Sequence, residues 1–294
     1  MVNKYHETVL TKEVIEALNI KKEGKYIDAT LGNGGHTLEI TKKGGSVLGI
    51  DIDPKMLEIS KKRLGGESVP PERWKLANGN FTQIDRIVKE NNWEGVSGIL
   101  FDLGVTNLHL KDLERGFSFG NPEAVLDMRM DPSAQGVKGS DLLNLLREDQ
   151  LRQLFEITIE PGAAKWITGR ILHSREVKPI ETVGDFLEIC SGLKTGKTTI
   201  NEATLPFLAV RIAVNSELSN LEEVLPKAFD LLEKGGRLVV ISFHSKEDTL
   251  VKNFFKEMVV RGSKMITFKP IMAGVGELSV NKRARSAKMR VLEK

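Results

Sequence analysis

Residues 26–37 constrain the fold more than any other segment, because a short apolar strand there runs into a glycine turn and then directly into a helix. Gly32, Gly34 and Gly35 occupy three of four consecutive positions. Glycine adopts positive φ and lets a ligand approach the main chain without a Cβ in the way. The following helix points its unpaired N–H groups into the turn. This pattern predicts a nucleotide-type cofactor site, with an ordinary strand–helix junction as the alternative.

Short apolar strands alternate with helices in the first hundred residues and again near the end of the chain. After the first strand, a second strand is predicted within residues 46–54, where a helix follows it, and further strands are predicted at 74–77, 96–101 and 237–243, with two shorter ones near 265–268 and 289–292. Such alternation is typical of an α/β fold with a parallel, doubly wound sheet. We therefore expect one sheet with helices on both faces.

The alternation breaks between about residues 111 and 211, where the sequence is turn-rich and helix-periodic without a comparable apolar strand. We predict an inserted helical domain at residues 113–211, with 1–112 and 212–294 forming the cofactor-binding domain. The chain has 294 residues, of which 40% are hydrophobic. This is enough for two domains with cores of their own.

Local signals predict two helix ends after the insert. The helix that leads back to the sheet is expected to end at Gly235-Gly236, a typical C-cap. The next helix, at residues 246–260, is expected to begin with Ser245 and Asp248 as a capping pair.

The composition excludes several classes of partner, compartment and metal site. The net charge of +3 excludes a general polycation but allows a local basic face. Cys190 is the single cysteine, which excludes an intrachain disulfide and a cysteine-rich zinc site. The N-terminal residues lack an apolar signal region, and no run of about 18 apolar residues occurs. A cytoplasmic protein outside the membrane is expected. The five histidines lack metal-ligand spacing, so no metal is expected.

The glycine turn and the second strand together limit which classes of cofactor the site can bind. Thr37 stands where a dinucleotide fingerprint has its third glycine, which disfavours a pyrophosphate ligand. Asp51 ends the second strand, 23 positions after Asp28, where a carboxylate for ribose hydroxyls is expected. Asp53 competes for this role, but its position before Pro54 is typical of a helix N-cap. A ribose-bearing, cationic and phosphate-free cofactor fits best, and S-adenosylmethionine is the commonest.

Asp102 follows the fourth predicted strand, at the edge of the sheet where open α/β folds place their chemistry. An exocyclic amine on a base is a poor nucleophile, because its lone pair is delocalised into the ring. A carboxylate that accepts its N–H localises the lone pair and takes the proton as it leaves. Asp102 is therefore the predicted catalytic residue, and Asp28 and Asp102 also suit the cationic groups of the cofactor. The alternatives are structural: Asp28 bonding the turn amides and Asp102 capping the next turn.

Several short segments extend these observations over nearly the whole chain. They are residues 28–37 (DATLGNGGHT), 102–105 (DLGV), 115–119 (RGFSF), 126–131 (LDMRMD), 209–212 (AVRI) with 214–217 (VNSE), 241–248 (ISFHSKED) and 281–286 (NKRARS). Their order and spacing closely resemble the MraW/RsmH family, the bacterial 16S rRNA (cytosine-N4)-methyltransferases. The resemblance implies a Rossmann-like class I methyltransferase sheet with an inserted helical substrate-recognition domain. It also implies a cytidine in the decoding region of 16S rRNA, within the small ribosomal subunit, as the substrate.

The resemblance assigns most of the cofactor contacts. By this resemblance the residues that contact S-adenosylmethionine are Gly34, Gly35, His36, Asp51, Phe81, Asp102 and His109, and the turn and first strand add Gly32 and Asp28. Two segments depart from the family pattern. Residues 106–109 read Thr-Asn-Leu-His where the family usually has Ser-Ser-Pro-Gln, so His109 replaces a glutamine. Residues 203–208 read Ala-Thr-Leu-Pro-Phe-Leu where the family tends to have Ala-Thr-Arg-Thr-Phe-Gln.

Substrate contacts are predicted in three segments. Phe243 and His244 follow the most apolar strand and supply a stacking ring and a polar edge for an extruded base. Phe117 lies in a loop with stacking potential, with the core of the helical domain as the alternative. Arg283 and Arg285 belong to a basic C-terminal segment that suits phosphate contacts, with a solvated charge run as the alternative.

Three other functions stay open at this point. An amino-methyltransferase acting on DNA or on a protein side chain would use the same carboxylate chemistry. A ribosome-assembly factor could hold S-adenosylmethionine only as a structural ligand. An NAD-dependent oxidoreductase is the weakest alternative, because the third fingerprint glycine is missing. The sequence leaves the oligomeric state open.

Overall fold

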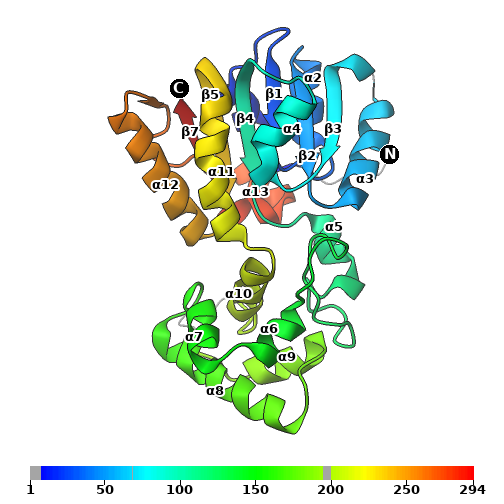
Figure 1. Ribbon diagram of the computed structural model, residues 1–294, viewed down its shortest axis with the longest axis vertical. Helices are drawn as coiled ribbons and strands as arrows, with labels where there is room; N and C mark the ends of the chain where they lie inside the picture. The colour runs from blue at the N-terminus through cyan, green and yellow to red at the C-terminus, as the bar shows by residue number, and fades with distance from the viewer. Residues whose placement is uncertain (1–7, 68, 195–199) are drawn as a thin grey trace. The chain divides into compact units, whose positions relative to one another are not determined.

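The protein divides into two compact units. The computed structural model describes residues 8–67, 69–194 and 200–294. The first unit is Met1–Gly104 with Leu218–Lys294, and the second is Val105–Glu217 (Figure 1). The predicted insert lies inside the second unit. The second unit is longer than the insert because Val105 and Val214 pack with its core.

The first unit is built on one seven-stranded sheet, ordered β3-β2-β1-β4-β5-β7-β6 within the described residues. The strands are β1 (Lys25–Asp28), β2 (Ser46–Asp51), β3 (Trp74–Asn78), β4 (Val96–Asp102), β5 (Leu232–Ser242), β6 (Lys264–Met265) and β7 (Lys288–Glu293). Strands β1 to β5 pair in parallel. β7 is antiparallel to both β5 and β6. The prediction of a parallel sheet is thus confirmed for β1 to β5, whereas β7 and its pairing with β6 make one edge of the sheet antiparallel.

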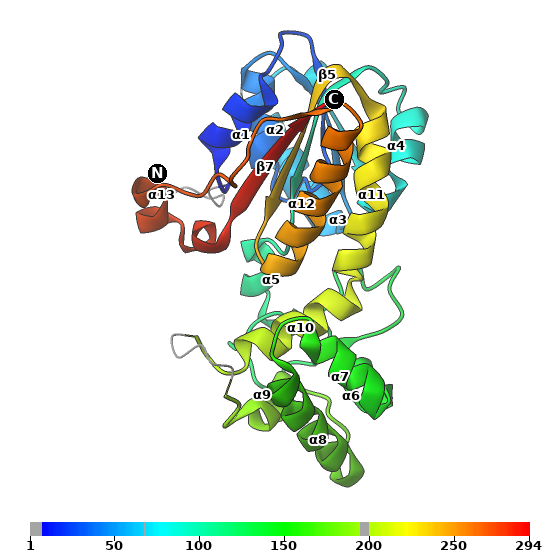
Figure 2. The ribbon, with the colours of Figure 1, turned by 90° about the vertical axis from the view of Figure 1, so that its left-hand side faces the viewer.

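Helices cover both faces of this sheet. They are α1 (Thr11–Leu18), α2 (Gly35–Lys42), α3 (Pro54–Gly65), α4 (Ile84–Glu90), α11 (Glu217–Leu231), α12 (Ser245–Val260) and α13 (Val275–Val280), with the 3₁₀ turns η1 (Pro71–Arg73), η2 (Phe81–Gln83) and η4 (Lys282–Ser286). Successive strand residues point to opposite faces. Ile99 and Phe101 therefore pack with α4, α11 and α12, whereas Leu100 packs with α1 and α2. Figure 2 shows these two helical layers on either side of the sheet.

The predicted C-cap at Gly235-Gly236 is wrong. α11 ends at Leu231, and β5 begins at the next residue. The pairing of β4 with β5 shifts register between Leu232 and Arg237, and Gly235 has φ of +78°. The two glycines therefore lie in an irregular start of the strand, where positive φ is needed, rather than at the end of a helix.

The start of α12 also differs from the prediction. His244 is the N-cap residue, and its Nδ1 accepts a hydrogen bond from the Glu247 N–H at 3.4 Å. Glu247 Oε2 accepts in return from the His244 N–H at 3.2 Å and also from the Phe243 N–H at 2.8 Å. Asp248 instead binds Arg290, with Nε to Oδ1 at 2.6 Å. The capping pair is thus one residue earlier than the predicted Ser245 and Asp248.

The second unit is helical. Its helices are α5 (Asn107–Lys111), η3 (Leu113–Arg115), α6 (Gly139–Leu145), α7 (Glu148–Glu156), α8 (Pro161–Val177), α9 (Val183–Cys190) and α10 (Thr204–Val214). Phe186 stacks on Phe207 with ring centroids 4.8 Å apart, and Phe155 lies 6.3 Å from Phe186. These rings form the centre of a core of its own. Across both units, none of the described helices has the length and apolar character needed to cross a membrane.

Candidate active site

The glycine turn lies between β1 and α2 and is fixed by its neighbours. Leu31 N–H donates to Ile50 O at 2.9 Å, which ties the turn to β2. Ser60 Oγ on α3 donates to Gly32 O at 2.7 Å. Gly34 has φ of +75°, and a Cβ there would lie 3.2 Å from Ser60 Cβ. The turn therefore requires glycine, and its main chain is held in place.

Asp51 closes the turn from the end of β2. Its Oδ2 accepts the Gly32 N–H at 2.7 Å, and its Oδ1 accepts the Asp53 N–H at 2.9 Å. Burial raises the pKa of Asp51 to about 7; the Asp53 and Asp28 charges add to this, and the two backbone hydrogen bonds oppose it. Asp53 instead caps α3 by accepting the Lys55 N–H at 2.9 Å. Asp51 is thus the carboxylate that binds the turn and Asp53 is the helix cap, whereas the predicted contact of Asp51 with a ribose stays a prediction.

Phe81 lies near the end of β3, close to Asp51 in the fold. The Gly79 N–H donates to Asp51 O at 3.0 Å, so the segment before Phe81 is tied to β2. The Phe81 ring meets Phe101 edge-on, with centroids 5.7 Å apart, and is only half-buried. Part of its aromatic surface is therefore exposed, in the segment that follows β3 and is tied to the end of β2.

Three titratable side chains meet at the ends of β1 and β4. Asp28 is fully buried, and its Oδ2 accepts from Thr37 Oγ1 at 2.8 Å. The Asp102 N–H donates to Thr30 Oγ1 at 2.6 Å, and Asp102 Oδ2 lies 3.7 Å from His36 Nε2. Burial raises the pKa of Asp28 and the Asp102 charge adds to this, whereas His36 and the Thr37 hydroxyl lower it.

Several buried atoms of this cluster have no hydrogen-bond partner among the described residues. They are Asp28 Oδ1, Asp102 Oδ1 and both ring nitrogens of His36. Buried polar atoms are normally paired, so unpaired ones indicate a place for a ligand or water. Two carboxylates suit a cationic ligand, and Asp51 suits hydroxyl donors. This donor set fits a cationic, ribose-bearing cofactor.

Three supporting hydroxyls were absent from the sequence prediction. Thr30 fixes the main chain of Asp102, Thr37 bonds Asp28, and Ser60 holds the glycine turn. Thr30 and Thr37 lie within residues 28–37, so their closeness in sequence to Asp28 is a signal that their hydroxyls bind the carboxylate cluster. Ser60 lies on a different helix, and no sequence signal connects it with the turn.

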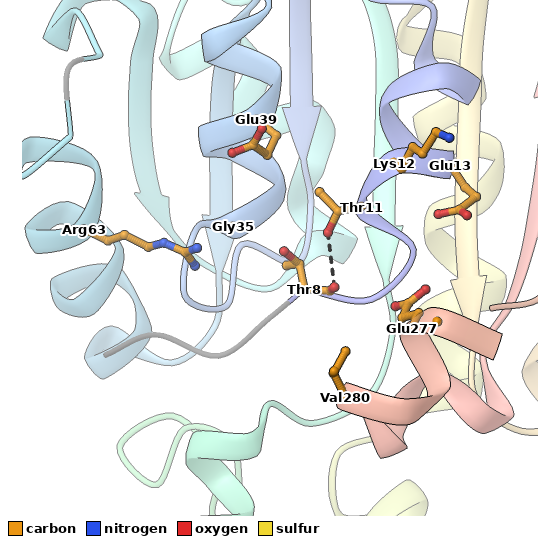
Figure 3. A pocket seen from close by; sticks show the side chains of 10 residues that line it. Thr8, Thr11, Lys12, Glu13, Gly35, Glu39, Arg63, Glu277 and Val280 are labelled. Carbon is orange, nitrogen blue, oxygen red and sulfur yellow. Dashed lines mark hydrogen bonds between the residues drawn. The ribbon is translucent and has the colours of Figure 1, made fainter. Parts of the chain in front are cut away.

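A cavity of about 470 Å³ opens beside Gly35 (Figure 3). It is lined by Thr8, Thr11, Lys12, Glu13, Gly35, Glu39, Arg63, Gly276, Glu277 and Val280. Asp51 and Asp102 are not among these lining residues. The cavity reaches the turn from the side of α1 and α13 and does not by itself outline the cofactor site.

His109 and Phe117 belong to the second unit. His109 Nδ1 accepts the Thr106 N–H at 3.3 Å, and its ring stacks on Phe117 with centroids 5.4 Å apart. Phe117 is only 8% exposed and packs in the helical core, as the alternative interpretation expected. Little ring surface is left for a base. The cofactor contact of His109 and the substrate contact of Phe117 stay predictions.

Phe243, His244 and Arg283 lie together beyond the end of β5. The Arg283 guanidinium lies 5.4 Å from the centroid of the Phe243 ring. His244 Nε2 is 3.3 Å from Glu247 Oε1, so this histidine faces its own helix. Arg285 is exposed two residues after Arg283. The structure thus brings an aromatic ring and a cation together near the strand end.

The comparisons with known proteins bear on this arrangement. The sequence pattern of the MraW methylase family matches residues 3–294. The chain belongs to this family. Ribosomal RNA small subunit methyltransferase H of Methylacidiphilum infernorum is 39% identical over 299 residues, covering 97% of this chain and 93% of that protein. The protein of the same name from Geobacter sulfurreducens is 39% identical over 311 residues, covering 98% of each. A solved rRNA methylase structure from Streptococcus thermophilus is 13% identical, with a TM-score of 0.44, and covers 99% of this chain and 98% of its own. Family membership confirms the resemblance drawn from the motifs.

Proposed function

We propose that the protein transfers the methyl group of S-adenosylmethionine to the N4 amine of a cytidine in small-subunit (16S) rRNA, in the cytoplasm. The observation that carries methyl transfer is the buried cluster of Asp28, His36 and Asp102 beside the glycine turn. The names of the relatives support rRNA as the substrate. The resemblance supports a decoding-region cytidine, and the chemistry proposed for Asp102 supports an exocyclic amine such as N4 as the acceptor.

The residues around the turn have complementary roles in holding the cofactor. S-adenosylmethionine supplies, when bound, a methyl group activated by a sulfonium. Gly34 supplies the positive φ of the turn, and Gly35 lets Thr8 pack against it, so the two glycines shape the main chain that would meet the cofactor. Asp51 accepts hydrogen bonds from ribose hydroxyls, and Phe81 offers its exposed ring surface to a base. The negative charge of Asp28 and Asp102 favours a cationic ligand.

Asp102 is the proposed acceptor of the amine proton. Its main chain is fixed by Thr30, and its buried Oδ1 has no partner among the described residues. When Oδ1 accepts the amine N–H, the lone pair of the nitrogen is localised for attack on the methyl carbon. Orientation of this kind contributes up to about 7–11 kcal/mol to lowering a barrier. A general base adds roughly 10²–10⁴-fold in rate.

The proposed RNA contacts lie on the first unit, beyond β5. The amine of a paired cytidine is inside the helix, so the base must be extruded to react. The Phe243 ring and the Arg283 guanidinium form a cation–π pair, and an aromatic ring and an arginine are groups on which an extruded base can stack. Arg285 is exposed and suits a phosphate.

A transfer assay with labelled S-adenosylmethionine tests the function. Small ribosomal subunits and naked 16S rRNA serve as substrates, and mass mapping locates the methyl group. We expect one methyl group on the N4 of one cytidine, and its loss with Asp102→Ala. Asp85→Ala, at an exposed carboxylate on α4, is the matched control and should stay active. Absence of transfer to any ribosomal substrate would refute the proposal, as would preferred transfer to DNA or to a protein amine.

A further inference from the structure

The main chain of Asp102 is anchored, but the buried carboxylate oxygen that would accept a proton is not. The Asp102 N–H donates to Thr30 Oγ1 at 2.6 Å, and the next N–H, of Leu103, donates to Ile241 O at 3.0 Å. Oδ1 has no hydrogen-bond partner among the described residues. A carboxylate that turns about its side-chain bonds presents Oδ1 in many directions. Efficient proton acceptance therefore needs a group that holds Oδ2.

His36 is the side chain placed to do this. It is the second residue of α2, is 2% exposed, and has its Nε2 at 3.7 Å from Asp102 Oδ2. Both of its ring nitrogens lack a hydrogen-bond partner among the described residues. A distance of 3.7 Å is an electrostatic contact rather than a hydrogen bond. Catalytic hydrogen bonds are often long in ligand-free proteins and shorten in the substrate complex.

We propose that His36 is a positioning residue, whose Nε2–H binds Asp102 Oδ2 and directs Oδ1 toward the substrate amine. This role rests on the proposed methyl transfer to an amine and deepens it. In the step, the nitrogen lone pair forms the new N–C bond with the methyl carbon, while the bond from that carbon to the sulfonium sulfur breaks and its electron pair stays on sulfur. The proton moves from nitrogen to Oδ1, and the N–H electron pair becomes the new lone pair on nitrogen. The proton on His36 Nε2 stays where it is.

Asp28 is a second carboxylate that interacts with His36, since the charge of His36 lowers the pKa of Asp28. Asp28 Oδ2, however, already accepts from Thr37 Oγ1 at 2.8 Å. Asp102 Oδ2 lies within the distance of an ion pair from Nε2. The geometry thus favours Asp102 as the partner, and a mutant cycle can separate the two.

Three variants of the full-length protein test the assignment. His36→Gln keeps an N–H donor near the position of Nε2, His36→Asn keeps one near Nδ1, and His36→Leu keeps none. We expect kcat to fall about 10–100-fold in the Asn and Leu variants, the usual cost of losing a group that orients a functional residue. The Gln variant should retain much more of kcat than the Asn and Leu variants, because its amide N–H can still reach Asp102 Oδ2. The contact of His36 with S-adenosylmethionine that the resemblance implies is assigned to its main-chain N–H in the first turn of α2, which all three variants keep, so the KM for S-adenosylmethionine should stay nearly constant.

Calorimetric binding of S-adenosylhomocysteine and thermal unfolding give readouts that are independent of turnover. The affinity should be the same within about threefold in all three variants, a change of less than 1 kcal/mol. If the His36→Leu variant does not fold, comparing kcat of His36→Gln with that of His36→Asn still tests whether a donor at the Nε2 position is needed. A Gln variant no faster than the Asn variant would overturn the role of His36. So would an affinity that falls in parallel with the rate.

A double-mutant cycle identifies the partner. In an Asp102→Asn background, adding His36→Leu should lower the residual rate no further, because the group that His36 orients is already lost. In an Asp28→Asn background, the effect of His36→Leu should remain. Additive effects with Asp102→Asn would overturn the pairing. An inactive wild-type protein would overturn the proposed function and this role together, whereas an active wild type with the wrong variant order overturns only this role.

Discussion

Affinity for the cofactor should depend on the ionisation of Asp51. The pKa of this carboxyl is raised to about 7, mainly by burial. Ribose hydroxyls are hydrogen-bond donors here, and the ionised carboxylate is the better acceptor. If only the ionised form binds, the apparent Kd is the intrinsic Kd divided by the ionised fraction. With a pKa of about 7 that fraction falls from about 0.9 at pH 8 to about 0.1 at pH 6, so binding should weaken about tenfold.

Calorimetric titration with S-adenosylhomocysteine at pH 6, 7 and 8 measures this dependence. Asp51→Asn should bind more weakly at pH 8 and lose most of the variation with pH. Asp85→Asn, at an exposed carboxylate on α4 away from the turn, is the matched control and should keep the variation. An affinity that is constant from pH 6 to 8 in the wild type would refute the reasoning, as would equal variation in Asp51→Asn.

The stability of the ligand-free protein should change with pH in the opposite sense. The pKa of Asp51 is higher in the folded protein than the 3.8 that is usual for an aspartate. Its contribution to stability is therefore fully present below about pH 4 and is lost as the pH rises through about 7. Bound S-adenosylhomocysteine should offset this loss. Thermal unfolding at pH 5 and 8, with and without the ligand, should show a larger ligand-induced shift at pH 8.

Further substitutions test the turn, the basic segment and the second core. Gly34→Ala should cost at least about 1–2 kcal/mol in chemical denaturation, because its φ is +75°, whereas Gly65→Ala, with open space around it, should be neutral. Arg285→Gln should reduce the salt dependence of RNA binding by about one unit of slope; Arg290→Gln, which breaks the pair with Asp248, should lower the melting temperature and leave that slope unchanged. Phe186→Ala should cost about 3–5 kcal/mol and melt the second unit first, with S-adenosylhomocysteine affinity retained.

Sequence patterns located the strands well because buried parallel strands are continuous apolar runs. Residues 99–101 are all apolar, which is typical of a buried strand, and in the structure Ile99 and Phe101 pack on one face of the sheet and Leu100 on the other. The assignment of Asp51 rather than Asp53 followed from Pro54, which fixes the start of α3. These predictions depend on local chemistry, which a sequence displays directly.

Other features depend on contacts between distant segments and could not be predicted. Gly235 has the chemistry of a helix cap, yet it serves the irregular start of β5 because β4 pairs there. Phe117 has the same ring whether exposed or buried, and only the fold of the second unit shows that it is buried. The approach of His36 to Asp102 joins residues from α2 and β4, and no spacing rule connects them.

The pairing of β4 with β5 also has a consequence for how the chain folds during synthesis. The two strands lie side by side, yet the whole second unit separates them in sequence. At a synthesis rate of roughly 5–20 residues per second, on the order of ten seconds pass between the emergence of β4 and that of β5. During this interval the edge of β4, with its apolar side chains, lacks its final neighbour. Independent folding of the second unit would bring the two strands closer together, so destabilising its core should increase aggregation of the nascent first unit.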